Sequence, residues 1–248
     1  MIKLLESIGR YIMLMKSVFS KPDRHRILYR QIIKEIMSLG VNSIGIVIII
    51  SGFMGAVITL QVRYNFESPF IPLYLIGLTA RDTMFLEFSS TIVGLILAGK
   101  VGSNIASEIG TMRISEQIDA LEIMGVNSAN YLILPKIVAA VFFNPFLTII
   151  SMFVGMLGGW LAVILTGALS PSDYIYGLHY WFIPYYILFG LVKATVFAFI
   201  ITSVPAYHGY YTSGGALEVG RSSTKGVVYS MILILFFDVI LTQLFLAK

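Results

Sequence analysis

The chain has 248 residues, of which 57% are hydrophobic and 12% charged, with a formal net charge of +4 and a mean hydropathy of +0.87. Soluble domains usually carry about 25% charged residues, so this composition excludes an ordinary soluble protein and indicates an integral membrane protein. The apolar segments are continuous rather than alternating, which favours transmembrane helices over a β-barrel. The chain has no cysteine and its three histidines lie in separate polar segments, so we expect no metal site.

The first 40 residues predict amphipathic helices that lie on the membrane surface. Apolar residues from Ile2 to Phe19 recur at helical spacing and alternate with lysine and arginine, a pattern typical of an interfacial helix. A basic turn follows, and residues 27–39 have a second, shorter amphipathic pattern. We therefore expect two parts, N-terminal interfacial helices over 1–40 and a five-span membrane domain over 41–248.

Five apolar runs predict the five transmembrane helices, at residues 41–62, 83–105, 131–167, 185–206 and 227–246. The third run is long enough for two crossings, but it offers nothing polar for a turn, so one long helix is the preferred interpretation. Residues 73–80 are apolar but too short to cross alone and are expected to be re-entrant or interfacial. Residues 208–226 are expected to be a loop.

Glycines in two of these spans predict close contacts between helices, because a residue without a side chain lets two backbones approach. They are Gly45, Gly52 and Gly55 in the first span and the pair Gly155 and Gly159 in the third.

The distribution of basic residues predicts the orientation. Thirteen lysines and arginines lie in the N-terminal segment or flank or fill the loops after the second and fourth spans, against three on the opposite side. Basic residues accumulate on the cytoplasmic side of membrane proteins, so we expect the N-terminus in the cytoplasm and the C-terminus outside.

Residues 98–125, which we call the island, are a polar stretch between the second and third spans. Ser115 is a fair N-cap for an acidic amphipathic helix, and Gly125 fits the position that ends it. Ile114, Ile118, Leu121 and Met124 repeat at helical spacing and predict one apolar stripe. The island is either a solvated loop helix or a docking helix that offers a partner an apolar stripe flanked by carboxylates.

Among the charged residues inside predicted spans we single out Glu87, Lys193 and Asp238. A charge at the bilayer centre costs about 3 kcal/mol, so these side chains are expected to face an interior and to pair with one another. Lys193 and Asp238 are the expected pair, with Glu87 as the alternative partner of Lys193. They either hold helices together or take part in transport. If they formed an ion path, the protein would be a self-sufficient ion-coupled carrier or channel.

Residues 94–101 have the glycine and lysine spacing of a phosphate-binding loop, but Val101 stands where Ser or Thr must reach magnesium. The segment also lies in an apolar helical run, so no ATPase site is expected in this chain.

The strings AGKVGSNIASEIGTMRISEQIDALEIMGV, YLILPKIVA, GYYTSGGALEVGRSSTKGVV and LILFFDVILT resemble the MlaE or YrbE permeases, over about residues 40–246. The resemblance implies that the island is a coupling helix seated on an ATPase subunit. Its candidate contact residues are Glu108, Arg113, Glu116, Ile118, Asp119, Leu121 and Glu122. Glu87, Lys193, Asp238 and Arg221 match charged positions of the family. Where the family usually reads Arg-Glu-Leu-Gly-Pro, this chain has Leu-Glu-Phe-Ser-Ser at 86–90.

The resemblance further implies a non-catalytic permease subunit of an ABC transporter that moves phospholipids or related lipids between the inner and outer membranes. Such a subunit is a homodimer in the inner membrane of a Gram-negative bacterium, with two ATPase subunits that carry ATP and Mg and a periplasmic lipid-binding protein of the MCE type. No cofactor in this chain and no nucleic-acid partner are expected. A lipid cavity between the two copies is expected to be lined by the fifth span and by Phe53, Val57, Leu60, Gln61 and Tyr64. The carrier alternative would be favoured by an inverted repeat, and none is seen.

Overall fold

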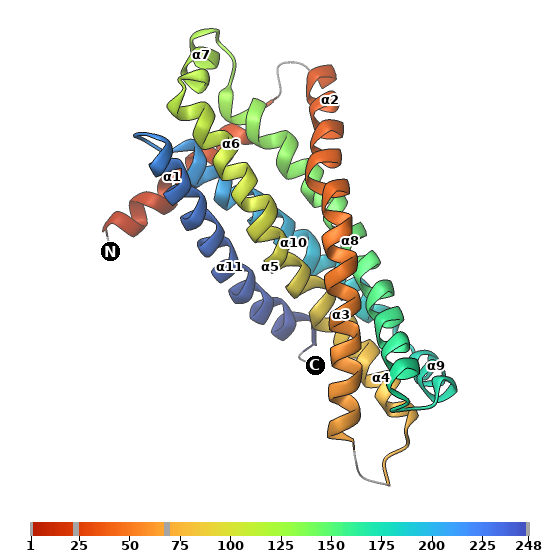
Figure 1. Ribbon diagram of the computed structural model, residues 1–248. Coiled ribbons are helices and arrows are strands. Elements are labelled where there is room, and N and C mark those ends of the chain that lie inside the picture. Colours follow the sequence, from red (N-terminus) through yellow and green to blue (C-terminus); the bar gives the residue numbers. More distant parts are fainter. Residues whose placement is uncertain (1, 22–24, 67–69, 247–248) are drawn as a thin grey trace. The chain divides into compact units, whose positions relative to one another are not determined.

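The computed structural model describes residues 2–21, 25–66 and 70–246, and every regular element within these ranges is a helix (Figure 1). Five stretches are long and apolar enough to cross a membrane: Arg26–Asn65, Tyr74–Ile114, Ser128–Thr166, Pro184–Tyr210 and Ala216–Leu246. An all-α membrane protein with five spans and a separate N-terminal helix is therefore confirmed.

The helical elements follow one another with few breaks. They are α1 (Ile2–Val18), α2 (His25–Glu35), the π-helical segment η1 (Ile36–Val41), α3 (Asn42–Asn65), α4 (Tyr74–Thr83), the π-helical segment η2 (Met84–Ile92), α5 (Val93–Leu97), the π-helical segment η3 (Ala98–Gly102), α6 (Ser103–Ile114), α7 (Gln117–Ile123), α8 (Ser128–Thr166), α9 (Pro171–His179), α10 (Pro184–Tyr210) and α11 (Ala216–Leu246).

Two sequence-based boundaries are wrong because helices run through them. Residues 73–80 are not a separate re-entrant piece, because the chain is continuously helical from Tyr74 to Ile114. The fifth helix begins at Ala216 instead of Val227, so residues 216–226 are helical and not a loop. The single long helix expected at 131–167 is confirmed as α8.

The chain forms two compact units. The first combines Met1–Asn42, Gly94–Phe143 and Val196–Ile240, and the second combines Ser43–Val93, Asn144–Thr195 and Leu241–Lys248. Each unit is therefore assembled from segments far apart in the sequence.

In the first unit, polar contacts anchor the N-terminal helix. The Tyr11 hydroxyl donates to Ser203 Oγ at 2.8 Å, and Asn130 Nδ2 donates to the carbonyl of Val18 at 2.7 Å. Leu14 and Val18 are buried. Burial raises the pKa of the Tyr11 phenol above its usual value, because it disfavours the charged phenolate. The apolar side chains and these two donors hold α1 against its unit.

The second unit is organised by close backbone contacts between helices. A Cβ atom on Gly55 of α3 would lie 1.8 Å from the carbonyl oxygen of Gly155 of α8, and one on Gly158 would lie 2.0 Å from that of Gly52. The predicted role of Gly52, Gly55 and Gly155 in close helix contact is therefore confirmed. Gly45 has nothing within 4 Å of its Cβ position and makes no such contact.

We expect Gly55→Ala to destabilise the protein and Gly45→Ala to leave it unchanged or slightly more stable. The new methyl group at residue 55 meets backbone, which cannot move aside like a flexible side chain, and overpacking of this kind costs about 1–3 kcal/mol. Both glycines lie within α3, so the change in helix propensity is shared. Thermal unfolding in detergent measures the difference, and equal melting temperatures of the two variants would contradict the packing assignment.

Candidate functional site

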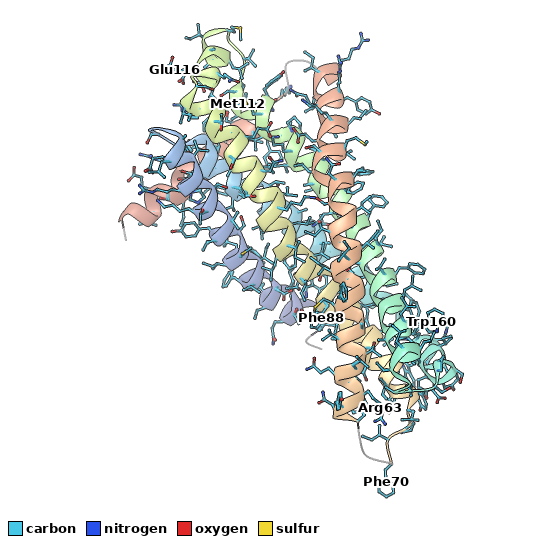
Figure 2. The ribbon with its side chains drawn as sticks, viewed as in Figure 1. Arg63, Phe70, Phe88, Met112, Glu116 and Trp160 are labelled. Atoms are coloured by element: carbon cyan, nitrogen blue, oxygen red, sulfur yellow. The ribbon has the colours of Figure 1, made fainter. Side chains whose placement is uncertain are left out.

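The island folds as the end of one helix and a short second helix. Helix α6 continues to Ile114, and α7 covers Gln117–Ile123. The prediction that Ser115 is the N-cap is wrong: its hydroxyl donates to the carbonyl of Thr111 in α6, and Glu116 precedes α7 with a φ of 60° (Figure 2). A left-handed conformation is unfavourable for a residue with a side chain, so the corner between the helices is tightly determined.

The end of α7 follows the prediction. Gly125 has a φ of 76°, its N–H donates to the carbonyl of Glu122, and the N–H of Val126 donates to that of Leu121. These two bonds make a Schellman motif, in which glycine takes the left-handed position after the helix. The predicted helix end at Gly125 is confirmed.

Side-chain contacts fix α7 within its own unit. Ile118 is fully buried, and Arg113 Nη1 lies 2.7 Å from Asp119 Oδ1. Glu122 Oε1 accepts from the hydroxyls of Ser128 at 2.8 Å and Tyr210 at 2.9 Å. The helix is therefore held in a definite orientation by one apolar contact, one ion pair and one shared carboxylate.

The surface that α7 presents differs from the predicted stripe. Ile118 points into the protein and Leu121 is half-buried, whereas Ile123 and Met124 are 87% and 68% exposed. Because the Ile118 side chain is buried, the apolar surface that α7 offers a partner consists of Ile123 and Met124. Glu116, just before α7, is also exposed. The predicted stripe is corrected accordingly.

Glu108 lies on α6 and belongs to an ion triad centred on a buried lysine. Lys136 Nζ of α8 lies 2.7 Å from Glu108 Oε2 and 2.8 Å from Glu35 Oε1 of α2. The Lys136 side chain is almost fully buried, and a buried ammonium is stable only when paired. The triad ties α2 and α6 to α8. Sequence reasoning counted Lys136 only as a basic flank, although a lysine inside an apolar run is a signal in itself.

Glu87 and Lys193 are brought together in the second unit. Lys193 Nζ donates to Glu87 Oε2 at 2.8 Å and to the carbonyl of Leu86 at 3.0 Å. The lysine side chain is 0% exposed and that of Glu87 is 39% exposed, and Thr242 donates to the second carboxylate oxygen at 3.3 Å. Glu87 stands in the π-helical segment η2, a distortion that often occurs at functional positions.

The remaining predicted charges lie on α11. Asp238 lies in the membrane-spanning part of α11 and is half-buried. Its pairing with Lys193 stays a prediction. Arg221 is exposed and pairs with Glu218 three residues earlier, at 2.6 Å. This contact lies within the first turns of α11, in the segment that sequence reasoning took for a loop.

The candidate cavity residues lie along α3. Phe53, Val57, Gln61 and Tyr64 are exposed and Leu60 is half-buried, and their spacing of three or four residues places them on one face of the helix. Helix α11 also lacks cover within a single chain: 11% of its most apolar window is buried, against 61% for α10. Both helices therefore present apolar faces that the chain itself does not cover.

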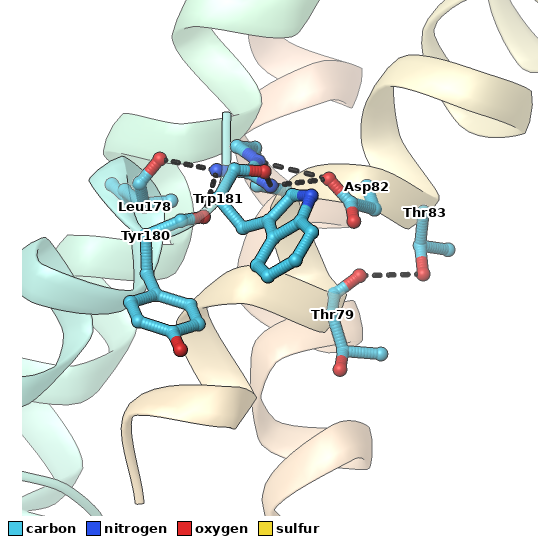
Figure 3. A network of polar contacts seen from close by, with 7 residues as sticks. Thr79, Asp82, Thr83, Leu178, Tyr180 and Trp181 are labelled. Atoms are coloured by element: carbon cyan, nitrogen blue, oxygen red, sulfur yellow. Dashed lines mark hydrogen bonds and ion pairs between the residues drawn. The ribbon is translucent and has the colours of Figure 1, made fainter. Parts of the chain in front are cut away.

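Arg81 is a buried cation that sequence reasoning missed. Its side chain is 1% exposed and lies 2.7 Å from Asp82 Oδ1. The guanidinium also donates to the carbonyls of Leu178, Tyr180 and Trp181, at 2.7, 2.9 and 3.3 Å (Figure 3). These carbonyls follow or end α9, so Arg81 supplies donors where the helix has none of its own. The signal in the sequence was the pair of charges at 81–82 next to an apolar run.

Within the described part of the chain, no group of three or more His, Cys, Asp or Glu side chains could hold a metal ion.

A family model described as Permease MlaE matches residues 32–244. A probable ABC transporter permease protein of Rickettsia bellii is 36% identical, over 98% of this chain and 94% of that protein. The intermembrane phospholipid transport system permease protein MlaE of Haemophilus influenzae is 29% identical, over 98% and 93% of the two chains. The chloroplastic protein TRIGALACTOSYLDIACYLGLYCEROL 1 of Arabidopsis thaliana is 31% identical, over 89% of this chain and 63% of that protein.

Proposed function

The chain belongs to the MlaE permease family, and from this premise we propose that it forms the lipid pathway of an ABC transporter that moves phospholipids or related lipids between the inner and outer membranes. As an ABC transporter permease it is the non-catalytic membrane component and depends on ATPase partners. That membership replaces the self-sufficient carrier as the interpretation of Glu87, Lys193 and Asp238.

The observation that carries the proposal is the exposed pair Ile123 and Met124 on an otherwise fixed α7. Isolated apolar side chains at the tip of a polar helix are typical anchors for a groove in a partner. The Arg113–Asp119 ion pair and the Glu122–Tyr210 hydrogen bond hold α7 against α6 and α10. A movement of Ile123 and Met124 is therefore transmitted to these two helices. We propose that α7 is the coupling helix and that two ATPase subunits bind the two copies of it in a homodimer.

Ile123→Arg is expected to reduce the recovery of a co-expressed ATPase subunit about tenfold or more, since losing an anchoring side chain typically costs 2 kcal/mol or more. Gln117→Arg is the matched control, because it adds the same charge to an exposed position of the same helix about 120° away. Membrane insertion and the melting temperature should stay unchanged in both. Undiminished recovery with Ile123→Arg would overturn the docking proposal.

The uncovered faces of α3 and α11 support a homodimer. Along α11, Val228, Ile232, Leu235 and Val239 recur on one exposed face. In a bilayer, such apolar faces contact either lipid or another protein helix. We propose that a second copy and the transported lipid cover them, with Phe53, Val57, Leu60, Gln61 and Tyr64 lining the cavity. Mass spectrometry of lipids that co-purify with the complex tests the substrate class.

Orientation and remaining partners follow from the same premise. The excess of basic residues favours a cytoplasmic N-terminus, with α7 on the same side as the ATPase. We propose the inner membrane of a Gram-negative bacterium as the location, the relative in Haemophilus influenzae being an intermembrane phospholipid transport permease. A periplasmic protein of the MCE type is the proposed lipid donor or acceptor. The domain boundary near residue 40 stays a prediction.

A further inference from the structure

The second unit contains an apolar groove of about 650 Å³ that the proposed transport pathway does not use. Four of its lining side chains, Phe153, Met156, Leu157 and Trp160, come from α8 at i, i+3, i+4 and i+7. This spacing places them on one face of the helix. The groove is therefore built by a regular helical stripe and shares no residue with the candidate cavity on α3.

The opposite wall repeats the pattern. Ile175, Leu178 and His179 of α9 line the groove at i, i+3 and i+4, and Phe182 follows three residues later. Both walls belong to one compact unit, and the α4–α9 contact is so close that a Cβ on Gly177 would lie 2.1 Å from the carbonyl oxygen of Tyr74. This backbone contact holds α9 rigidly against α4.

The size of the groove favours a narrow occupant. A helix with its side chains is about 10 Å across, so 650 Å³ would hold only about 8 Å of it, or one and a half turns. A membrane-spanning helix of a partner needs about 30 Å. The volume instead falls within the range of about 300–1,000 Å³ of small-molecule pockets.

The length of the groove fits within one leaflet. From Phe153 to Trp160 the axis of α8 rises about 10 Å, less than the roughly 15 Å that is half of the hydrocarbon core. At the α9 end, His179 is exposed and is followed by Tyr180 and Trp181, the residue types that collect at the membrane interface. The groove thus has an interfacial end and an apolar end.

Trp160 (Figure 2), which lines the groove, carries a buried polar group. Its indole Nε1 is buried and finds no acceptor among the described residues. A buried N–H without an acceptor is unfavourable, and the ester carbonyls of a lipid are acceptors at the interfacial level. Because the nitrogen is shielded, the indole must turn about its side-chain torsions before such an acceptor reaches it.

We propose that this groove binds one acyl chain of a bilayer phospholipid, with the ester end of the lipid toward His179 and the tail along Phe153, Leu157 and Ile175. It is a second lipid site, distinct from the transport cavity, and it binds a lipid whether or not the ATPase is docked.

The two tryptophans of the chain provide the test. Trp181→Phe leaves Trp160 as the only indole, and the full-length permease in nanodiscs is compared in phosphatidylcholine with and without 9,10-dibromostearoyl chains. We expect quenching of Trp160 emission by about a factor of two or more, since pockets of this size bury most of their ligand. As the brominated share of the lipid rises, the remaining Trp160 emission should fall linearly, which is the dependence expected when the indole contacts a single lipid.

Matched variants separate the groove from the ordinary lipid shell. Leu157→Phe fills the groove, whereas Leu161→Phe makes the same change one turn further along α8, at an exposed residue that does not line it. Quenching should fall with Leu157→Phe and persist with Leu161→Phe. If Leu157→Phe does not fold, Ile175→Phe fills the groove from α9 instead. Absent quenching, which would mean that protein covers the groove, would overturn the proposal. A quenching that rises more steeply than linearly with the brominated lipid fraction would also overturn it, as would equal quenching in Leu157→Phe and Leu161→Phe. None of these readouts depends on ATPase docking or transport.

Discussion

Replacing Lys193 by methionine is expected to lower the melting temperature of the detergent-solubilised protein by on the order of 10 °C. Lys193 is fully buried and donates to Glu87 at 2.8 Å, so its removal leaves the carboxylate without that cation in a membrane-spanning segment. Breaking a buried pair costs about 3–5 kcal/mol. Because Glu87 is 39% exposed, we expect the lower end of that range.

The double variant Lys193→Met with Glu87→Leu is expected to recover much of the loss, because two apolar side chains can replace a buried pair almost without cost. The control is Arg10→Met, which breaks the exposed pair with Glu6 and should cost about 0.3–0.5 kcal/mol. If the double variant's loss equals the sum of the two single losses, the residues are not coupled. A recovered fold with recovered lipid transport would mean that the pair only holds helices together, whereas a folded but inactive protein would assign it to the transport cycle.

Arg81→Met is expected to destabilise the protein by about 3–5 kcal/mol. The guanidinium is 1% exposed and donates to three backbone carbonyls in or just after the last turn of α9, besides pairing with Asp82. Without it, Asp82 loses its partner and the carbonyls lose their donors, in a region where water cannot replace them fully. The melting temperature in detergent should fall by on the order of 10 °C, and protease cleavage between α9 and α10 should become faster.

Arg81→Lys tests the geometry of the network. An ammonium keeps the charge but has three donors instead of five and cannot form the same fork, so we expect only partial rescue. Arg221→Met is the matched control, since Arg221 is exposed and pairs only with Glu218 among the contacts described for it. A full rescue by lysine would show that the charge alone matters, and a loss with Arg221→Met as large as with Arg81→Met would contradict the network's role.

The number of spans, the N-terminal helix and the end of α7 could be predicted from the sequence. A run of about 20 apolar residues has no alternative to a helix in the bilayer, because every backbone polar group must be satisfied within the segment. Gly125 ends α7 because glycine takes a left-handed conformation without strain. Glu87, Lys193 and Asp238 could be predicted to pair among themselves, because an intramembrane charge is costly wherever it stands, but the contact of Lys193 with Glu87 is seen only in the structure.

The sequence does not determine which side chain meets which, because a partner contributed by a distant segment leaves no local pattern. The three carbonyls that Arg81 binds lie 97, 99 and 100 residues further along the chain. Lys136 likewise joins Glu35 and Glu108 from two other helices. The inward turn of Ile118 was equally hidden: periodicity places it on a stripe with Leu121 and Met124, but only packing decides which part of the stripe is buried. Amphipathic spacing defines the faces of a helix, and the tertiary structure alone decides what covers each face.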